Sequence, residues 1–199
     1  MTLLDHRPAE SFRERSIPVL ETERLILRAP RLEDAKALAM LANDRRIAEN
    51  TARIPHPYGI ADAESFFASV NKRDGEIAFL ITRDDTVIGT CGIAPPRREA
   101  PELGYWLGVP FWGQGYATEA ARAVIDHAFA DLGYEELEAG ARVTNPASRR
   151  VLEKCGFQWT GVGLTRVRAL ASSVPSDRFR LERGIWASLK SWGAVKRVA

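Results

Sequence analysis

The sequence is poor in the features that mark several large classes of protein. It has two cysteines, Cys91 and Cys155, which set no disulfide framework. We interpret both as small buried or half-buried thiols in a reducing compartment. No stretch approaches the roughly 18 apolar residues of a membrane span. Residues 1–20 carry charges throughout and lack the apolar run of a signal peptide. These absences predict a cytoplasmic protein with no membrane partner.

Charge of one sign and metal-binding side chains are also scarce. Lys and Arg number 28 against 26 Asp and Glu, and this net charge of +2 is too small to argue for a nucleic-acid partner. The three histidines form no cluster with metal-ligand spacing, so we predict no metal. The chain has 199 residues and no repeats, which favours one globular domain over residues 21–190. We expect a loose arm over 1–20 and a tail over 191–199.

The chain is organised around a change of hydrophobic period between residues 102 and 132. Residues 102–109 alternate, which predicts a strand with Leu103, Tyr105 and Leu107 on the face opposite Glu102. Apolar residues then recur at helical spacing over 115–132. Two glycines lie in the short turn between these segments. Because a helix start has unpaired N–H groups and a partial positive charge, this arrangement predicts a phosphate site.

Two common phosphate motifs do not fit this turn. The dinucleotide fingerprint needs a third glycine, but Thr118 stands where that glycine would follow Gly113 and Gly115. No Gly-Lys-Ser/Thr follows either, so the turn is not a P-loop. A plain tight connection remains the alternative at this point.

The stretch instead resembles the acetyl-coenzyme A signature of the GNAT acetyltransferase superfamily, in the form typical of its RimJ/RimL-type branch. The family pattern runs Gln/Arg-x-x-Gly-x-Gly/Ala. Gly115 and Ala117 match it, and Trp112 occupies the first position, as is familiar in that branch. The other parts are Gly-Tyr-Trp-Leu at 104–107 and Asn-Pro-Ala-Ser-Arg-Arg-Val-Leu-Glu-Lys-Cys-Gly-Phe at 145–157. The resemblance extends from about residue 23 to 186.

The pattern of the remaining segments agrees with a mixed α/β or α+β fold. We expect strands at 23–28, 76–83, 86–93, 102–109, 135–143, 157–168 and 176–186, and helices at 31–48, 61–70, 115–132 and 145–156. This is the GNAT order, with a six- to seven-stranded sheet and about four helices. The resemblance also implies a bulge in the strand at 102–109 and a splay from its neighbour.

The resemblance assigns the donor, acetyl-CoA, to the central turn. Its pyrophosphate suits the amides of the helix start, and its pantetheine arm would pair with backbone near Leu107 and Val109. Asn145 followed by Pro is a helix N-cap by its own pattern, and the matching family Asn also hydrogen-bonds the pantetheine arm. The cofactor-binding residues implied are therefore Leu107, Val109, Gln114, Gly115, Tyr116, Ala117, Thr118 and Asn145.

Glu102 is the candidate general base. An amine attacks a thioester only when neutral, so a carboxylate beside the acceptor serves the reaction. A Glu at the corresponding place acts as base in several GNAT enzymes. The alternative is a half-exposed strand residue paired with Arg97 or Arg98.

Ser148 is the candidate general acid. Many relatives have a Tyr where this sequence has Leu152, and RimL-type enzymes carry a Ser in this motif. The alternatives are a hydroxyl that only bonds backbone, and water as the acid.

The sequence thus favours an N-acetyltransferase that moves an acetyl group from acetyl-CoA to a primary amine by direct attack in a ternary complex. The amine could belong to a protein N-terminus or a small molecule, because acceptor pockets lie where one sequence says least. A non-catalytic acyl-CoA-binding module is the alternative. The family also allows a homodimer, although no interface follows from the sequence.

Overall fold

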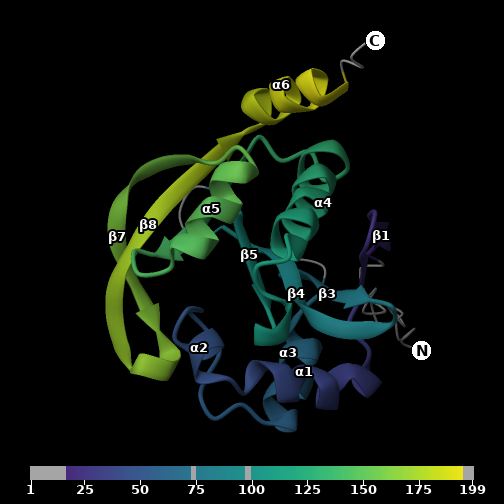
Figure 1. The fold of residues 1–199 in the computed structure, drawn as a ribbon, viewed down its shortest axis with the longest axis vertical. Coiled ribbons are helices and arrows are strands. Elements are labelled where there is room, and N and C mark those ends of the chain that lie inside the picture. Colours follow the sequence, from purple (N-terminus) through teal and green to yellow (C-terminus); the bar gives the residue numbers. More distant parts are fainter. Residues whose placement is uncertain (1–16, 73–74, 97–99, 195–199) are drawn as a thin grey trace, which may run out of the picture.

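One eight-stranded sheet forms the centre of the molecule. The computed structural model describes residues 17–72, 75–96 and 100–194. The strand order is β1-β2-β3-β4-β5-β6-β8-β7 (Figure 1). The strands are β1 (Leu20–Glu21), β2 (Ile26–Arg28), β3 (Ile77–Arg83), β4 (Thr86–Ala94), β5 (Glu102–Leu107), β6 (Glu136–Arg142), β7 (Gln158–Val167) and β8 (Ser172–Glu182). Within the described ranges only β5 and β6 pair in parallel, so the predicted mixed α/β class is confirmed.

Helices cover both faces of the sheet. They are α1 (Ala35–Ala42), α2 (Arg45–Ala48), α3 (Ile60–Ser69), α4 (Tyr116–Ala130), α5 (Pro146–Lys154) and α6 (Arg183–Ala194), with 3₁₀ turns η1 (Leu32–Asp34), η2 (Val109–Phe111) and η3 (Arg168–Leu170). α4 packs on the central strands and lies beside α5. α1 and α3 pack together near β4 on the opposite face of the sheet (Figure 1). None of the helices in the described ranges combines the length and apolarity needed to cross a bilayer.

The counts of strands and helices differ from the prediction at three places. β1 adds a strand at Leu20–Glu21, inside the expected arm, and residues 1–16 of that arm lie outside the described residues. The helix expected over 31–48 is interrupted after Asn43. There Asp44 takes an extended conformation, and its side chain accepts a hydrogen bond from the N–H of Arg46. Asp44 is thus the N-cap of α2, which begins as a separate helix.

The third difference is at the end of the sheet. The strand expected to reach Trp186 ends at Glu182, and α6 begins at Arg183. The Arg183 guanidinium donates to the carbonyls of Phe129 and Tyr134. The helix brings the Trp186 ring to 5.3 Å from that of Phe129. Burial of this aromatic pair against α4 therefore outweighs the alternating pattern that predicted a longer strand.

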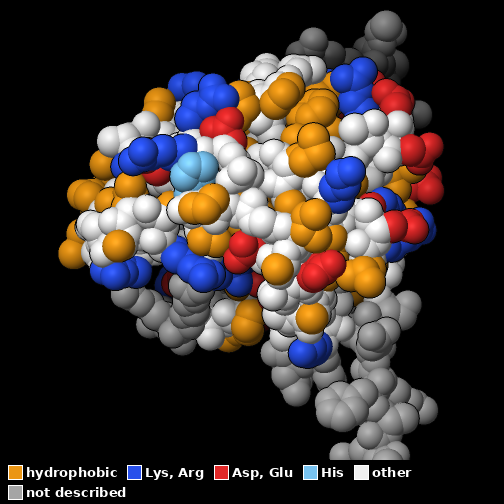
Figure 2. All heavy atoms as spheres, turned by 90° about the horizontal axis from the view of Figure 1, so that it is seen from below, with side chains coloured by type: hydrophobic (Ala, Val, Ile, Leu, Met, Phe, Trp, Pro, Cys, Tyr) orange, Lys and Arg blue, Asp and Glu red, His pale blue; other side chains and the backbone are white. Residues whose placement is uncertain are grey.

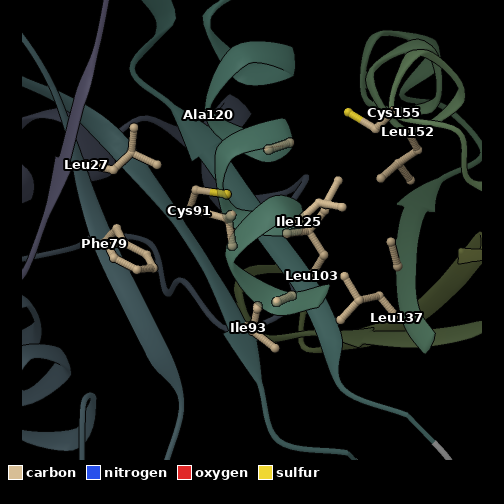
Figure 3. Close-up of a cluster of buried hydrophobic side chains, with 14 of the residues drawn as sticks. Leu27, Phe79, Cys91, Ile93, Leu103, Ala120, Ile125, Leu137, Leu152 and Cys155 are labelled. Atoms are coloured by element: carbon tan, nitrogen blue, oxygen red, sulfur yellow. The ribbon is translucent and has the colours of Figure 1, made fainter. Parts of the chain in front are cut away.

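The main core lies between the sheet and the helices α4 and α5. Figure 3 shows Cys91, Leu103 and Leu137 from the strands facing the helical side chains, with Leu152 on α5 and Cys155 just after its end. Both cysteines are free and buried, as predicted. Burial raises the pKa of the Cys155 thiol to about 11, so it stays protonated near neutral pH.

A buried ion pair ties β2 to the start of the first helix. Arg28 donates two hydrogen bonds of 2.8 Å to the Asp34 carboxylate, which also accepts the N–H of Arg31. Burial acts to raise the pKa of Asp34, but these bonds outweigh it, and the pKa lies below its ordinary value. The carboxylate therefore stabilises the fold above a pH of about 4, and this contribution is lost as the pH falls through the lowered folded-state pKa.

Asp34→Ala is expected to lower the free energy of unfolding by about 3 kcal/mol, because it leaves the Arg28 guanidinium without its partner. Urea denaturation at neutral pH measures this difference. Glu33→Ala is the matched control, since the Glu33 side chain is 73% exposed and should change stability by less than about 0.5 kcal/mol. Equal losses in the two variants would contradict the role given to Asp34.

Candidate functional site

The two parallel strands at the centre of the sheet separate after two residue pairs. β5 pairs with β6 only at Glu102–Glu138 and Leu103–Ala139. Beyond these pairs β5 continues along β4, while β6 continues along β8. The predicted splay is therefore present. The predicted bulge is wrong, because the β4–β5 ladder keeps one register through Leu107. The splay opens a gap in the sheet between β5 and β6.

Backbone groups of β5 and η2 face this gap. The N–H of Gly108 donates to the carbonyl of Ile88 on β4, so strand alternation turns the backbone groups of Leu107 away from β4. The Leu107 carbonyl accepts the indole N–H of Trp112 at 2.8 Å, which fixes the turn. The N–H groups of Leu107 and Val109 remain for a ligand, and neither donates a hydrogen bond to a described residue outside the β ladder. A ligand in the gap would therefore meet donors here.

The turn after η2 ends in an uncapped helix. Gly115 has φ +86° and precedes the first residue of α4, and no side chain caps the helix. The amides of Tyr116, Ala117 and Thr118 thus begin a 15-residue helix without a side-chain acceptor. Gly113, at φ +75°, lies in the same turn. Unpaired backbone N–H groups at the start of a helix are the arrangement that binds anions, so the geometry agrees with the phosphate site predicted from the sequence.

Tyr116 offers only its backbone at this turn. Its side chain is 4% exposed and packs in the main core. The guanidinium groups of Arg24 and Arg83 lie 4.6 and 5.4 Å from the ring centroid. The aromatic ring therefore holds the helix start in place and does not face a ligand at the turn.

Arg24 brings a positive charge to the turn. It donates to the carbonyl of Gln114 at 3.1 Å, and its guanidinium lies 3.4 Å from where a Cβ on Gly115 would be. Arg24 also pairs with Glu119 in the first turn of α4. Burial acts to raise the pKa of Glu119, but hydrogen bonds from Thr22 and Arg24 outweigh it and keep its pKa low. Arg24 thus offsets an acid that would otherwise repel a phosphate.

Glu102 faces a cavity on the other side of β5. Glu102 and Trp106 share a sheet face and line a cavity of about 900 Å³. Residues of β3, β4, β6, β7 and β8, of α1 and α3 and of the segment 50–58 also line it, as do Leu103 and Tyr105 from the other face of β5. Among the described residues none donates a hydrogen bond to the Glu102 carboxylate. Arg97 and Arg98, its alternative partners from the sequence, lie outside the described residues.

Two hydrogen bonds to backbone carbonyls join the walls at one end of this cavity. The N–H of Arg168 in η3 donates to the carbonyl of Ala52 at 3.0 Å. The Arg142 guanidinium donates to the carbonyl of Glu49 at 2.6 Å. The loop after α2 is thereby joined both to the tip of the β7–β8 hairpin and to the end of β6. The cavity is bridged by backbone at this end.

Ser148 lies on the opposite face, at the start of α5. Asn145 caps this helix by accepting the N–H of Ser148, as predicted. The Ser148 hydroxyl is 3.0 Å from the Tyr105 hydroxyl, which also donates to the Ser148 carbonyl. Burial raises the pKa of Tyr105 above its ordinary value, against the effect of the Ser148 bond, so the phenol stays protonated. Leu152 is fully buried in the core (Figure 3).

Comparison with known proteins decides the family. The acetyltransferase (GNAT) domain matches residues 24–158. The chain belongs to the GNAT acetyltransferase family. Uncharacterized N-acetyltransferase YoaA of Bacillus subtilis is 35% identical over 160 residues, which cover 73% of this chain and 85% of YoaA.

Solved structures agree on the fold of this GNAT acetyltransferase. Mycobacterium smegmatis RimJ in complex with CoA-disulfide superposes with a TM-score of 0.73, at 20% identity over 85% of this chain and 89% of RimJ. Microcin C7 self immunity acetyltransferase MccE, in complex with acetyl-CoA and AMP, gives 0.70, at 22% identity over 81% and 93%. The predicted family is confirmed, and a RimJ protein is among its structural neighbours. The protein is an acetyl-CoA-dependent acetyltransferase.

Sequence reasoning missed two side chains of the GNAT acetyltransferase site. Arg24 lies about 90 positions before the turn it supports, and no local pattern connects the two. Tyr105 was predicted to share a strand face with Leu103 and Leu107, although its place in the Gly-Tyr-Trp-Leu motif could have drawn attention to its hydroxyl. Among the described residues no group of three His, Cys, Asp or Glu side chains could hold a metal ion.

Proposed function

We propose that the protein transfers the acetyl group of acetyl-CoA to a primary amine by direct attack in a ternary complex. The observation that carries this proposal is the β5–β6 gap. Glu102 faces the cavity from one face of β5, while the helix start of α4 and the Tyr105–Ser148 pair lie on the other face, from which Tyr105 lines the same cavity. A thioester held in the gap would be open to an amine from the cavity while its sulfur faces α5.

The donor half of the proposal uses the cofactor-binding residues predicted from the sequence. The pyrophosphate of acetyl-CoA binds the backbone from Gln114 to Thr118, including Gly115, Tyr116 and Ala117. The pantetheine arm runs through the gap past the amides of Leu107 and Val109 and the side chain of Asn145. The CoA-disulfide in RimJ and the acetyl-CoA in MccE support a ligand of this class on the same fold.

The acceptor half assigns the proton transfers. Glu102 takes a proton from the amine, whose nitrogen forms a bond to the acetyl carbon. The Val109 N–H stabilises the oxyanion of the tetrahedral intermediate. The carbon–sulfur bond then breaks, and the Ser148 hydroxyl, supported by Tyr105, donates a hydrogen bond and a proton to the departing thiolate. Glu102 and Ser148 thus act from opposite faces of the sheet.

The cavity favours a small acceptor over a folded protein. The Ala52–Arg168 bond bridges one end, and a volume of about 900 Å³ suits a molecule of drug size or the first residues of a peptide.

Ser148→Ala and Tyr105→Phe are each expected to lower kcat by roughly tenfold to a hundredfold, because each removes one hydroxyl of the pair that faces the sulfur. The Kd for acetyl-CoA should stay within about twofold. Steady-state release of the CoA thiol measures kcat. Ser188→Ala is the control, since the Ser188 hydroxyl bonds only its own helix at Gly184. Unchanged kcat in Ser148→Ala would remove Ser148 from the reaction and leave water as the acid.

A further inference from the structure

The floor of the cavity beyond Glu102 is a patch of charged side chains on β6 and β8. The register pairs Glu138 with Arg180, Gly140 with Arg178 and Arg142 with Ser176. All of these residues line the cavity. Arg142 and Arg178 form a diagonal pair on one face of the sheet, so their Cβ atoms lie roughly 7 Å apart.

Some of the arginines that line the cavity are neutralised by acids, but the two on its floor are not. Arg53 pairs with Glu76, and Arg180 pairs with Glu136. Neither Arg142 nor Arg178 forms an ion pair within the described residues. The Arg142 Nε atom is buried without any hydrogen-bond partner. The Nη1 atom of Arg142 donates to the carbonyl of Glu49, so the charge of this guanidinium is not compensated by a carboxylate of the described residues.

Two glycines shape the space around Arg178. A Cβ on Gly163 would lie 2.1 Å from the Arg178 Nη2 atom, so the guanidinium occupies the room that this glycine leaves on β7. A Cβ on Gly140, between β5 and Arg178, would lie 3.9 Å from the Glu102 Oε1 atom. The floor between the Glu102 carboxylate and the Arg178 side chain is therefore free of a side chain.

The surface near the hairpin tip is also basic. Arg166 and Arg168 line the cavity and are exposed, while Arg45 and Arg46 on α2 are exposed but pair with Glu49 and Asp44. Figure 2 shows basic side chains gathered on the left of the face seen from below, the side where Figure 1 places the hairpin tip and α2. Such a field raises the local concentration of an anionic substrate.

We propose that the acceptor is a primary amine that also carries a carboxylate. The carboxylate binds Arg178, with Arg142 beside it, and the amine lies over Gly140 against Glu102. Guanidinium groups bind carboxylates through paired, charge-assisted hydrogen bonds, which fixes the direction of the acceptor in the cavity. This inference rests on the proposed function. A free amino acid and a peptide with an acidic residue near its N-terminus both have this chemistry.

The test compares acceptors that differ only in the carboxylate. Glutamate and alanine are assayed against their carboxamides, and a tripeptide with Asp at position two against its Asn analogue, with acetyl-CoA as donor. The amine of an amino-acid carboxamide is less basic than that of the free acid. The measured quantity is therefore kcat/KM for the acid divided by kcat/KM for its carboxamide, called the acid-to-amide ratio, and its change between variants. Arg178→Gln is expected to lower that ratio at least about tenfold, with turnover of the amides little changed.

Two further variants make the result specific. Gly163→Ala keeps every charge but displaces the Arg178 guanidinium, so it should also lower the ratio. Arg31→Gln removes a charge from an exposed side chain outside the cavity and should leave the ratio unchanged. The inference is overturned if Arg178→Gln keeps the wild-type ratio for both amino acids and peptides. If no amine is acetylated, the proposed function itself is refuted. If the carboxamides are acetylated and no variant changes the ratio, only the recognition of a carboxylate is refuted.

Discussion

Gly115→Trp is expected to raise the Kd for acetyl-CoA at least about a hundredfold, a loss of roughly 2.7 kcal/mol in binding. Gly115 takes φ +86° and forms the concave side of the turn before α4. A side chain there would cover the amides of Ala117 and Thr118 and press on Arg24, whose guanidinium is 3.4 Å from the Cβ position. Isothermal titration with acetyl-CoA measures the effect.

A substitution at a second glycine separates steric blocking of the turn from backbone strain. Gly133 also has a positive φ of +71°, and a Cβ there would meet no atom within 4 Å. Gly133→Trp should therefore carry a similar strain and a similar fall in Tm, with acetyl-CoA affinity near that of wild type. Tight binding by Gly115→Trp, or equal weakening in both variants, would refute the placement of the pyrophosphate.

Glu102→Gln is expected to lower kcat by about two to four orders of magnitude, because the amide cannot accept the proton of the attacking amine. The Kd for acetyl-CoA should not change, since Glu102 faces the cavity and the α4 start faces the other side of β5. A wild-type kcat in Glu102→Gln would remove Glu102 from the mechanism.

Glu138→Gln is the comparison for charge alone. Glu138 pairs with Glu102 across β5 and β6 and lines the same cavity. If Glu102 acts as base, Glu138→Gln should keep kcat within about threefold of wild type. Equal losses in the two variants would show that the negative charge of the cavity matters and that neither carboxylate is the base.

The local parts of the site were predictable from the sequence because they depend on local patterns. Gly115 and the helical spacing after it predicted the uncapped start of α4, and Asn145 followed by Pro predicted the cap of α5. Backbone conformation near a glycine or proline is set by the residue itself. The alternation of 102–107 likewise placed Glu102 and Tyr105 on opposite faces.

The remaining parts depend on contacts between distant segments. The Tyr105–Ser148 pair and the bond of Arg24 to the turn join residues far apart in the chain. The predicted end of the last strand was wrong because Trp186 packs against Phe129 only in the folded protein. The role of Gly163 becomes visible only when the Arg178 guanidinium is seen above it. Tertiary packing decides such details, and one sequence does not display it.

The central claim is that acetyl-CoA bound in the β5–β6 gap gives its acetyl group directly to an amine from the cavity. Incubation of the purified protein with acetyl-CoA and a panel of amino acids, peptides and simple amines, followed by mass spectrometry, tests it most directly. The account predicts an N-acetylated amine in equal amount to the CoA released, and no acetylated form of the enzyme. Tight binding of acetyl-CoA without acetylation of any amine would contradict it and indicate a non-catalytic acyl-CoA-binding module.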